Sequence, residues 1–268
     1  MKYIISFIGA GNMGSALAAA ACKTVGPDRI IVTNRSLEKA KSLADRLGCH
    51  LAPNNLDAAR DANFVMLGVK PQDIHQVTKE LTPVLTGNQV LVTMAAGVAI
   101  DSLARCLDKP VPIIRILPNT PCAIGHGLIL ISASEKDKKH VSWLMDILKA
   151  AGSFQVIPES LMDSGCVAAG CSPAYAYMFI DAIAKGTQAV GLPYAIGLTC
   201  AANAVLGAAA MILETGKNPE ELKNAVCSPG GSTIEGARVL EEGGLYNIVA
   251  RAAEASYRRN IQLGKENE

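Results

Sequence analysis

The sequence predicts an α/β fold for its N-terminal part, with a mostly parallel, doubly wound sheet, and an all-α fold for the remainder. The first observation is an alternation of β-branched apolar runs with amphipathic stretches, which is the pattern that places helices on both faces of a parallel sheet. The second is a glycine-rich turn between the first apolar run and the first helical stretch. The third is a change of character near Pro158, beyond which no convincing strand pattern remains.

Short apolar runs place the expected strands at residues 3–8, 29–33, 64–68, 89–94, 112–116, 127–131 and 154–156. Amphipathic stretches place helices between them at residues 14–23, 37–47, 72–85, 99–106 and 136–151. In a sheet of this kind ligands bind in the crevice at the carboxyl ends of the strands, so we expect the site in the loops there.

Beyond residues 157–160, Gly and Pro breaks separate expected helices at residues 160–170, 173–190, 194–214, 219–226, 232–242 and 246–263. We therefore expect two domains, residues 1–158 and residues 159–268. The helix at residues 194–214 is apolar nearly all round, which predicts that it is buried. A helical domain of this size buries such a helix poorly by itself, so we expect a homodimer formed through the C-terminal helices.

The run Gly9-Ala10-Gly11-Asn12-Met13-Gly14 follows a predicted strand and opens a predicted helix. In that context G-x-G-x-x-G indicates a dinucleotide site of the Rossmann type. The first glycine permits the tight turn, the second lets the backbone approach a pyrophosphate, and the third lets the helix pack against its strand. The alternative is a tight turn with spare glycines, and the flanking strand and helix favour the nucleotide site.

The end of the second predicted strand indicates which dinucleotide is bound. An NAD site usually carries an acid about 20 residues past the glycines, whereas this chain has Asn34-Arg35-Ser36 near that place. An arginine and a serine would bind a 2′-phosphate, which an acid would repel. We therefore expect NADP, with NADPH preferred over NADH. The alternative is a polar turn in which Ser36 caps the next helix, and both can hold at once.

Three more segments follow predicted strands and should line the same crevice: Val69-Lys70-Pro71, Ala95-Ala96-Gly97 and Leu117-Pro118-Asn119-Thr120-Pro121. Lys70 could hydrogen-bond a cofactor ribose or amide, or could be an ordinary solvated lysine. The turn at Asn119 and Thr120 could equally be structural, because proline restricts both itself and the residue before it.

A second anion site is expected at Ser228-Pro229-Gly230-Gly231-Ser232-Thr233, directly before a predicted helix. Glycines followed by hydroxyl side chains at a helix start offer free N–H groups and a favourable dipole end. A substrate carboxylate would suit this segment. The alternative is an ordinary helix cap with a flexible entry.

The composition narrows the classes of protein. The chain has 268 residues and a net charge of +1 with no basic run, so we expect no nucleic-acid partner. We expect no segment long and apolar enough to span a membrane, and no room for a leader peptide before the first strand, which together favour the cytoplasm. Eight scattered cysteines are expected to be reduced thiols, and four isolated histidines lack metal-ligand spacing, so no metal is expected.

These motifs, with Arg115-Ile116-Leu117-Pro118-Asn119-Thr120-Pro121 and Pro173-Ala174-Tyr175, occur in the same order in the pyrroline-5-carboxylate reductases. The chain resembles that family over nearly its whole length. The resemblance implies an oxidoreductase that reduces the imine of 1-pyrroline-5-carboxylate to L-proline with NAD(P)H, the last step of proline biosynthesis. It also implies a helical C-terminal domain that intertwines with a partner subunit, in dimers that often assemble into decamers.

The resemblance carries over residue by residue. It assigns the cofactor to Gly9, Gly11, Asn12, Met13, Gly14, Asn34, Arg35, Asn55, Val69, Lys70 and Pro71. It assigns the substrate carboxylate to the loop containing Ser228, Gly230, Gly231, Ser232 and Thr233. Because the cofactor supplies the hydride, the protein needs mainly to position the substrate and to polarise the ring nitrogen, and Thr233 is the candidate catalytic donor.

One loop departs from the family pattern. The segment before Pro-Ala-Tyr usually reads Ser-Gly-Ser-Gly, and here it is Ala169-Gly170-Cys171-Ser172. Cys171 is a weaker hydrogen-bond donor than serine, and its thiol is a candidate for oxidation. The departure bears on substrate geometry rather than on the fold.

Two alternative functions stay open on the sequence. A non-catalytic NADP-binding paralogue is supported only by the Cys171-Ser172 departure. A reductase of the 3-hydroxyacid dehydrogenase type would need a lysine general acid in the helical domain, and Lys185-Gly186 does not match that pattern.

Overall fold

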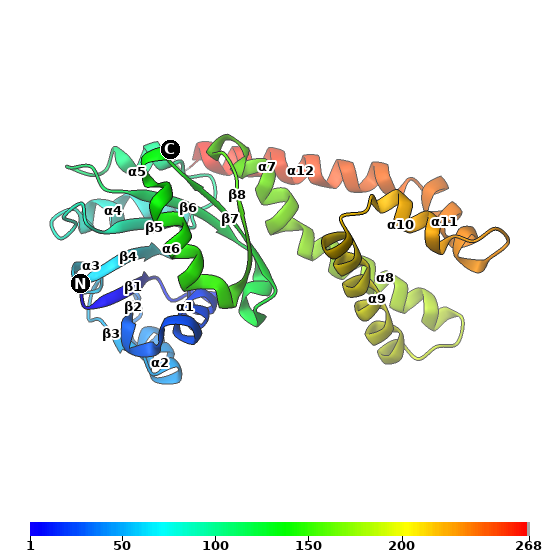
Figure 1. Cartoon of the computed structure of the whole chain (residues 1–268), viewed down its shortest axis with the longest axis horizontal. Coiled ribbons are helices and arrows are strands. Elements are labelled where there is room, and N and C mark those ends of the chain that lie inside the picture. Colours follow the sequence, from blue (N-terminus) through cyan, green and yellow to red (C-terminus); the bar gives the residue numbers. More distant parts are fainter. Residues whose placement is uncertain (267–268) are drawn as a thin grey trace. The chain divides into compact units, whose positions relative to one another are not determined.

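A computed structural model describes residues 1–266 of the chain and contains two compact units. The first unit comprises Met1–Cys171 together with the chain from Ser256 onward, and the second comprises Ser172–Ala255. The chain therefore passes between the units twice, once after Cys171 and once after Ala255. The first unit contains the sheet, and the second is built only of helices (Figure 1).

The strands of the first unit are β1 Tyr3–Ile8, β2 Ile30–Thr33, β3 His50–Leu51, β4 Ala62–Leu67, β5 Val90–Thr93, β6 Ile113–Pro118, β7 Gly127–Ala133 and β8 Gly152–Val156. They form one sheet in the order β3-β2-β1-β4-β5-β6-β7-β8. Every neighbouring pair is parallel except β6 and β7. The predicted fold class, a mostly parallel sheet followed by helices, is confirmed.

Helices cover both faces of this sheet because its central strands are apolar on both sides. On one face, Phe7 and Phe64 pack in a core that also contains residues of α1 Asn12–Val25, α2 Leu37–Leu47 and α6 Lys138–Leu148. On the other face, Ile8 and Leu67 pack in a core with residues of α3 Asn55–Arg60, α4 Ile74–Leu81 and α5 Ile100–Ala104. The loops at the carboxyl ends of β1, β2 and β4 are held between these two cores.

The remaining helices are α7 Met162–Cys166, α8 Ser172–Ala189, α9 Tyr194–Thr215, α10 Pro219–Val226, α11 Ser232–Glu242 and α12 Leu245–Glu266. A π-helical turn, Val167–Cys171, joins α7 to α8 without a break. In the helical unit the Tyr194 hydroxyl donates to Asp181 at 2.8 Å, which ties the start of α9 to α8. Tyr175 on α8 contacts the Ala252 carbonyl of α12 at 3.4 Å.

The bounds of several elements differ from those predicted. The two-residue strand β3 was not predicted, because two residues are too short to show an alternating pattern. The helix predicted at residues 72–85 begins at Ile74, after the 3₁₀ turn Pro71–Asp73, and ends at Leu81. Thr82 keeps helical dihedral angles, but Pro83 has no N–H to donate to the preceding turn. The helix predicted at residues 160–170 is instead the short helix α7 and the π-helical turn.

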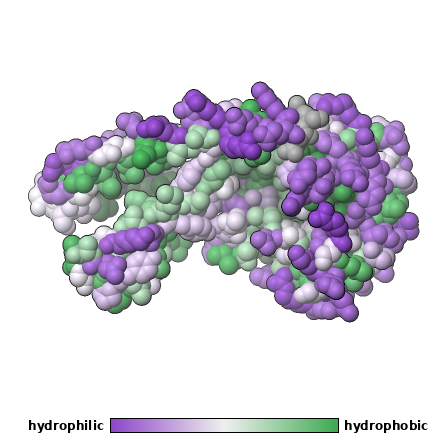
Figure 2. All heavy atoms as spheres, turned by 180° about the vertical axis from the view of Figure 1, so that it is seen from behind, coloured by the Kyte–Doolittle hydropathy of each residue, from purple (hydrophilic) through white to green (hydrophobic). Residues whose placement is uncertain are grey.

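Helix α9 is exposed within a single chain, although its composition predicted burial. Only Gly197 and Ala201 of α9 are buried, whereas Leu206 and Leu213 are 64% and 85% exposed. Figure 2 shows apolar side chains among hydrophilic ones on the surface of the helical unit. Contacts within the described chain thus leave the apolar surface of α9 uncovered.

The expectation that no segment is long and apolar enough for a membrane span was wrong. Two helical stretches pass that test by length and composition, Glu159–Ala189 with a mean hydropathy of 1.3 and Tyr194–Thr215 with 1.9. The second stretch is the whole of α9, which extends beyond its alanine-rich part in both directions. Length and composition alone also fit a helix that packs against other protein.

A buried arginine ties the end of α12 to the sheet within the first unit. Arg115 on β6 pairs with Glu159 at 3.4 Å and with Asp163 on α7 at 3.1 Å. The side-chain amide of Asn260 on α12 donates to the same Asp163 carboxylate at 3.1 Å. Because the Arg115 side chain is only 4% exposed, its charge depends on these two carboxylates for compensation.

Candidate dinucleotide site

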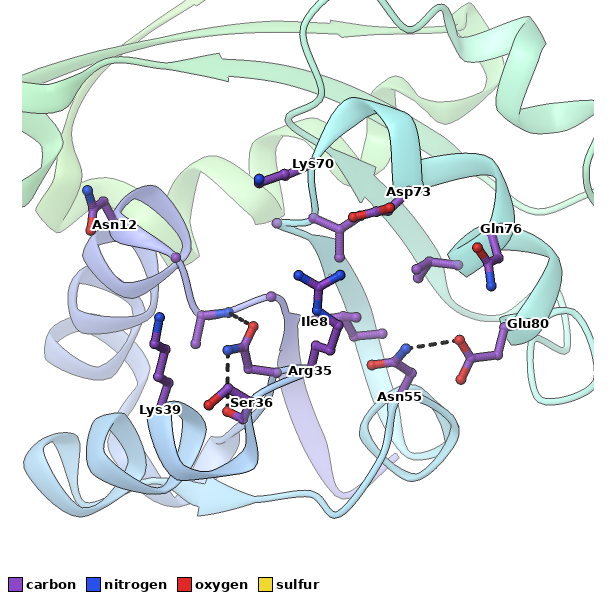
Figure 3. A pocket seen from close by; sticks show the side chains of 17 residues that line it. Ile8, Asn12, Arg35, Ser36, Lys39, Asn55, Lys70, Asp73, Gln76 and Glu80 are labelled. Atoms are coloured by element: carbon purple, nitrogen blue, oxygen red, sulfur yellow. Dashed lines mark hydrogen bonds between the residues drawn. The ribbon is translucent and has the colours of Figure 1, made fainter. Parts of the chain in front are cut away.

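A pocket of about 760 Å³ opens at the carboxyl ends of β1, β2 and β4 (Figure 3). Its lining residues are Ile8, Gly9, Ala10, Gly11, Asn12, Asn34, Arg35, Ser36, Lys39, Asn55, Gly68, Val69, Lys70, Asp73, Gln76, Val77 and Glu80. The strand ends are held together by backbone hydrogen bonds, since Gly9 donates to Thr33 at 3.0 Å and Gly68 donates to Ile8 at 2.7 Å. The pocket lies where a doubly wound sheet binds its ligand.

The three glycines of the motif have different surroundings. Gly9 adopts a φ of +102°, and a Cβ there would lie 2.5 Å from the Gly68 carbonyl oxygen. A Cβ on Gly14 would lie 2.3 Å from the Gly9 carbonyl oxygen, so this glycine lets α1 start close beneath the turn. A Cβ on Gly11 would meet nothing within 4 Å. Gly11 is therefore not required by packing inside the chain, and its open side faces the pocket that it lines.

Asn34 fixes the loop after β2 against the glycine turn. Its side-chain oxygen accepts from the Ala10 N–H at 3.3 Å, and its side-chain nitrogen donates to the Ser36 carbonyl at 3.3 Å. Ser36 occupies the N-cap position of α2, but its hydroxyl makes no capping bond. The alternative in which Ser36 serves as a side-chain cap thus fails, and its hydroxyl stays available to the pocket.

Three cationic side chains line the pocket. Arg35 extends from the loop after β2 toward the middle of the pocket, with Lys39 on the neighbouring turn of α2 and Lys70 on the far wall (Figure 3). No hydrogen bond or ion pair within residues 1–266 occupies the Arg35 guanidinium. The Asn55 side-chain amide donates a hydrogen bond to the Glu80 carboxylate, with 3.0 Å between Nδ2 and Oε2. The free cations and the open N-terminus of α1 together suit a ligand that carries several phosphates.

Most of the predicted cofactor residues meet in this pocket: Gly9, Gly11, Asn12, Asn34, Arg35, Asn55, Val69 and Lys70 line it. Three do not line it. Met13 packs against the core, Gly14 is buried within α1, and Pro71 begins the 3₁₀ turn Pro71–Asp73. The sequence reasoning missed Lys39, Gly68, Asp73, Gln76, Val77 and Glu80. A signal existed for Lys39, because it lies in the first turn of the predicted helix that directly follows Arg35 and Ser36.

The other two segments expected in the crevice do not line this pocket. Asn119 fastens the structure instead, since its side chain donates to the Ala169 carbonyl at 3.0 Å and accepts from the Leu128 N–H at 2.9 Å. Gly97 packs against α12, where a Cβ would lie 2.6 Å from Gly264. The structural alternative for the Asn119 turn therefore agrees with these contacts, and Gly97 is required by close packing.

The predicted substrate loop lies between α10 and α11 in the helical unit. Gly230 adopts a φ of +74°, and the Gly231 N–H donates to the Ser228 carbonyl at 3.0 Å, which closes a tight turn. That N–H is used within the turn and is not available to an anion. Ser232 and Thr233 begin α11 and are exposed, and Gly231 at its N-cap makes no side-chain capping bond. The helix start therefore keeps free N–H groups beside two hydroxyls.

The fold and this pocket define the class of protein as a dinucleotide-binding oxidoreductase of the Rossmann type. Residues 4–97 match the family model described as NADP oxidoreductase, coenzyme F420-dependent. Residues 159–263 match the family model described as pyrroline-5-carboxylate reductase dimerisation. The first match covers the strands and loops that form the pocket, and the second covers most of the helices that follow the sheet.

Known relatives define the family. The chain is 37% identical to the pyrroline-5-carboxylate reductase of Escherichia coli (strain K12) over 99% of this chain and 100% of that protein. Among solved structures it is similar to a pyrroline-5-carboxylate reductase from Coxiella burnetii, with a TM-score of 0.90 and 31% identity over 98% of this chain and 99% of that one. The Plasmodium falciparum enzyme, solved with NADP bound, matches with a TM-score of 0.85 and 26% identity over 98% of this chain and 99% of that one. The chain belongs to the pyrroline-5-carboxylate reductase family.

Proposed function

We propose that this chain reduces the imine of 1-pyrroline-5-carboxylate to L-proline with NADPH as its preferred hydride donor, in the last step of proline biosynthesis. The reaction is that of the family to which the chain belongs. The observation that carries the NADPH preference is the Arg35 guanidinium, which is unoccupied within residues 1–266 and stands at the wall where an NAD site usually has an acid.

The pocket residues bind and orient the cofactor, which supplies the hydride when bound. Gly9, Gly11, Asn12, Met13 and Gly14 form the turn and helix start that receive the pyrophosphate. Arg35, with Ser36 and Lys39 beside it, receives a 2′-phosphate, and Asn34 holds their loop in place. The remaining proposed cofactor contacts are Asn55, Val69, Lys70 and Pro71.

The loop before α11 binds the substrate carboxylate. Ser228, Gly230, Gly231, Ser232 and Thr233 form this site, with the free N–H groups at the helix start as the charge-stabilising donors. The Thr233 hydroxyl donates a hydrogen bond to the ring nitrogen, which must accept the electron pair as the hydride adds to carbon. No strong base is needed, because the reaction adds a hydride and a proton to a C=N bond.

We propose that residues 1–158 act as the NADP-binding domain and residues 159–268 as the helical substrate-binding and dimerisation domain. The exposed apolar side chains of α9 support a homodimer through these helices, in which a partner subunit covers them. We propose further that the dimers assemble into decamers and that the protein is cytoplasmic. It is proposed to have no nucleic-acid or membrane partner. Sedimentation at micromolar concentration tests the assembly, and a monomer there would exclude it.

The deciding experiment is a coupled assay of the purified chain. NADPH oxidation is followed with and without pyrroline-5-carboxylate, and NADH is tested in parallel. We expect substrate-dependent oxidation, with a lower KM for NADPH than for NADH. Tight NADPH binding without turnover would support the non-catalytic paralogue instead. The hydroxyacid-dehydrogenase alternative loses support because Lys185 is engaged by Asp181 at 2.7 Å, and this pairing raises the pKa of the lysine.

A further inference from the structure

The π-helical turn Val167–Cys171 brings two cysteines together that a regular helix would separate. Cys166 and Cys171 are five residues apart, and in an α-helix such side chains point about 140° apart. A π-turn, with its i→i+5 hydrogen bonds, places such positions one above the other. The Cys166 sulfur lies over the turn itself, because a Cβ on Gly170 would be 3.4 Å from it.

The two thiols are neighbours across this turn. Both residues are half-buried. Burial, followed by the neighbouring Cys171 and Asp163, raises the pKa of the Cys166 thiol. A raised pKa makes a thiol less reactive, so we assign the first attack on an oxidant to Cys171 rather than Cys166.

The turn that carries these thiols is hydrogen-bonded to the sheet of the first unit and leads directly into the helical unit. Asn119, at the end of β6, donates to the Ala169 carbonyl in the middle of the turn. Cys171 is the last residue of the first unit, and Ser172 is the first residue of the helical unit. A change of backbone geometry between residues 166 and 171 would therefore alter one of the two segments that connect the helical unit to the first unit.

We propose that Cys166 and Cys171 form a dithiol site that oxidises reversibly to an intrahelical disulfide, with hydrogen peroxide as the oxidant. The Cys171 thiolate attacks a peroxide oxygen, which breaks the O–O bond, releases one water after protonation and leaves a sulfenic acid. The Cys166 thiol then attacks that sulfur, and its proton leaves with the hydroxyl group as a second water. Two thiols are oxidised, one hydrogen peroxide is reduced, and a dithiol reductant reverses the reaction.

Oxidation should lower turnover. A disulfide fixes an S–S distance of about 2.05 Å and a restricted Cβ–Cβ separation, so it must draw the two positions closer than two thiols that are not bonded to each other. The turn then deforms between the unit that holds the dinucleotide pocket and the unit that holds the proposed substrate loop. This consequence rests on the proposed function, whereas formation of the disulfide does not.

Peptide mapping of the full-length protein tests the site directly. The protein is reduced, desalted, treated with hydrogen peroxide, alkylated and digested with trypsin. Cleavage after Lys149 and Lys185 yields a peptide, residues 150–185, whose only cysteines are these two. We expect this peptide without alkyl groups and lighter by two hydrogens than its reduced form, and we expect dithiothreitol to restore two alkylation sites.

Two variants sharpen the test. In Cys171→Ser the peptide should lose the two-hydrogen shift, while Cys200→Ser, which removes an exposed cysteine on α9, should retain it. Wild-type turnover should fall on oxidation and recover on reduction, whereas Cys171→Ser should show the same turnover before and after peroxide. A wild-type peptide that stays fully alkylated after peroxide would overturn the proposal. A reduced protein without turnover would contradict the proposed function, and the peptide mass would still decide the disulfide.

Discussion

Arg35→Ala should weaken the binding of NADPH but not that of NADH, and it should leave the fold unchanged. Within residues 1–266 the Arg35 side chain makes no hydrogen bond or ion pair, and the cap of α2 does not depend on it. We therefore expect the free energy of unfolding to change by no more than about 0.5 kcal/mol, as for other surface substitutions.

The loss of NADPH affinity in Arg35→Ala can be estimated from the hydrogen bond that Arg35 is proposed to make to the 2′-phosphate. A hydrogen bond to a charged group contributes about 1.5–3 kcal/mol, which corresponds to about 10–150-fold in affinity. Arg35 is exposed, and Lys39 and Lys70 remain in the pocket, so the effect should lie near the lower end, about tenfold. NADH lacks the 2′-phosphate, so the KM of the variant for NADH should stay within about twofold of the wild-type value. A twofold change corresponds to a few tenths of a kcal/mol, as expected for a surface substitution.

Initial rates at saturating pyrroline-5-carboxylate, with each dinucleotide varied in turn, measure both effects. Arg46→Ala is the matched control, because Arg46 is also an exposed arginine near the end of α2 but does not line the pocket. Equal increases in KM for NADPH and NADH would show that Arg35 does not contact the 2′-phosphate. An unchanged KM for NADPH would remove Arg35 from the site altogether.

Three further predictions test the glycine turn, the substrate loop and the buried ion pair. Gly14→Ala should lower the free energy of unfolding in urea by about 1–3 kcal/mol, because its Cβ would overlap the Gly9 carbonyl. Gly11→Ala should weaken NADPH binding with little loss of stability, because a Cβ there meets no other atom of the chain. A larger loss of stability in Gly11→Ala than in Gly14→Ala would contradict the packing argument. Thr233→Ala should lower kcat/KM by about 10- to 1000-fold with normal NADPH binding, and unchanged kinetics would exclude it as a donor. Breaking a fully buried ion pair costs roughly 3–5 kcal/mol, and Arg115→Met should lower the free energy of unfolding by no more than the lower end of that range, because the partner carboxylates are 31% and 30% exposed. Thermal unfolding measures the effect, and an unchanged midpoint would show that the pair does not stabilise the fold.

The sheet could be predicted from the sequence because each central strand is a continuous apolar run bounded by a turn. The edge strand β3 could not, since His50 and Leu51 become a strand only by pairing with β2. The π-turn was also hidden, because Val167–Cys171 has an ordinary helical composition and its extra residue per turn leaves no periodic signal over five positions.

The dinucleotide pocket was predictable where it is formed by residues next to the ends of strands. Gly9, Asn34 and Lys70 were found in this way, since the carboxyl ends of parallel strands converge on one edge. Gln76 and Glu80 were missed because they lie on α4 and reach the pocket only through the packing of that helix beside α3. Their spacing of four residues indicates one helix face, but nothing local indicates what that face meets.

The division of the first unit between both ends of the chain has a consequence for synthesis on the ribosome. Asn260, which hydrogen-bonds Asp163 beside Arg115, lies 97 residues after Asp163 and is translated after the whole helical unit. Domains of most proteins fold as they emerge, N-terminal first. The nascent sheet therefore leaves its arginine incompletely covered until α12 has emerged, so the first unit is completed only after the helical unit has been synthesised.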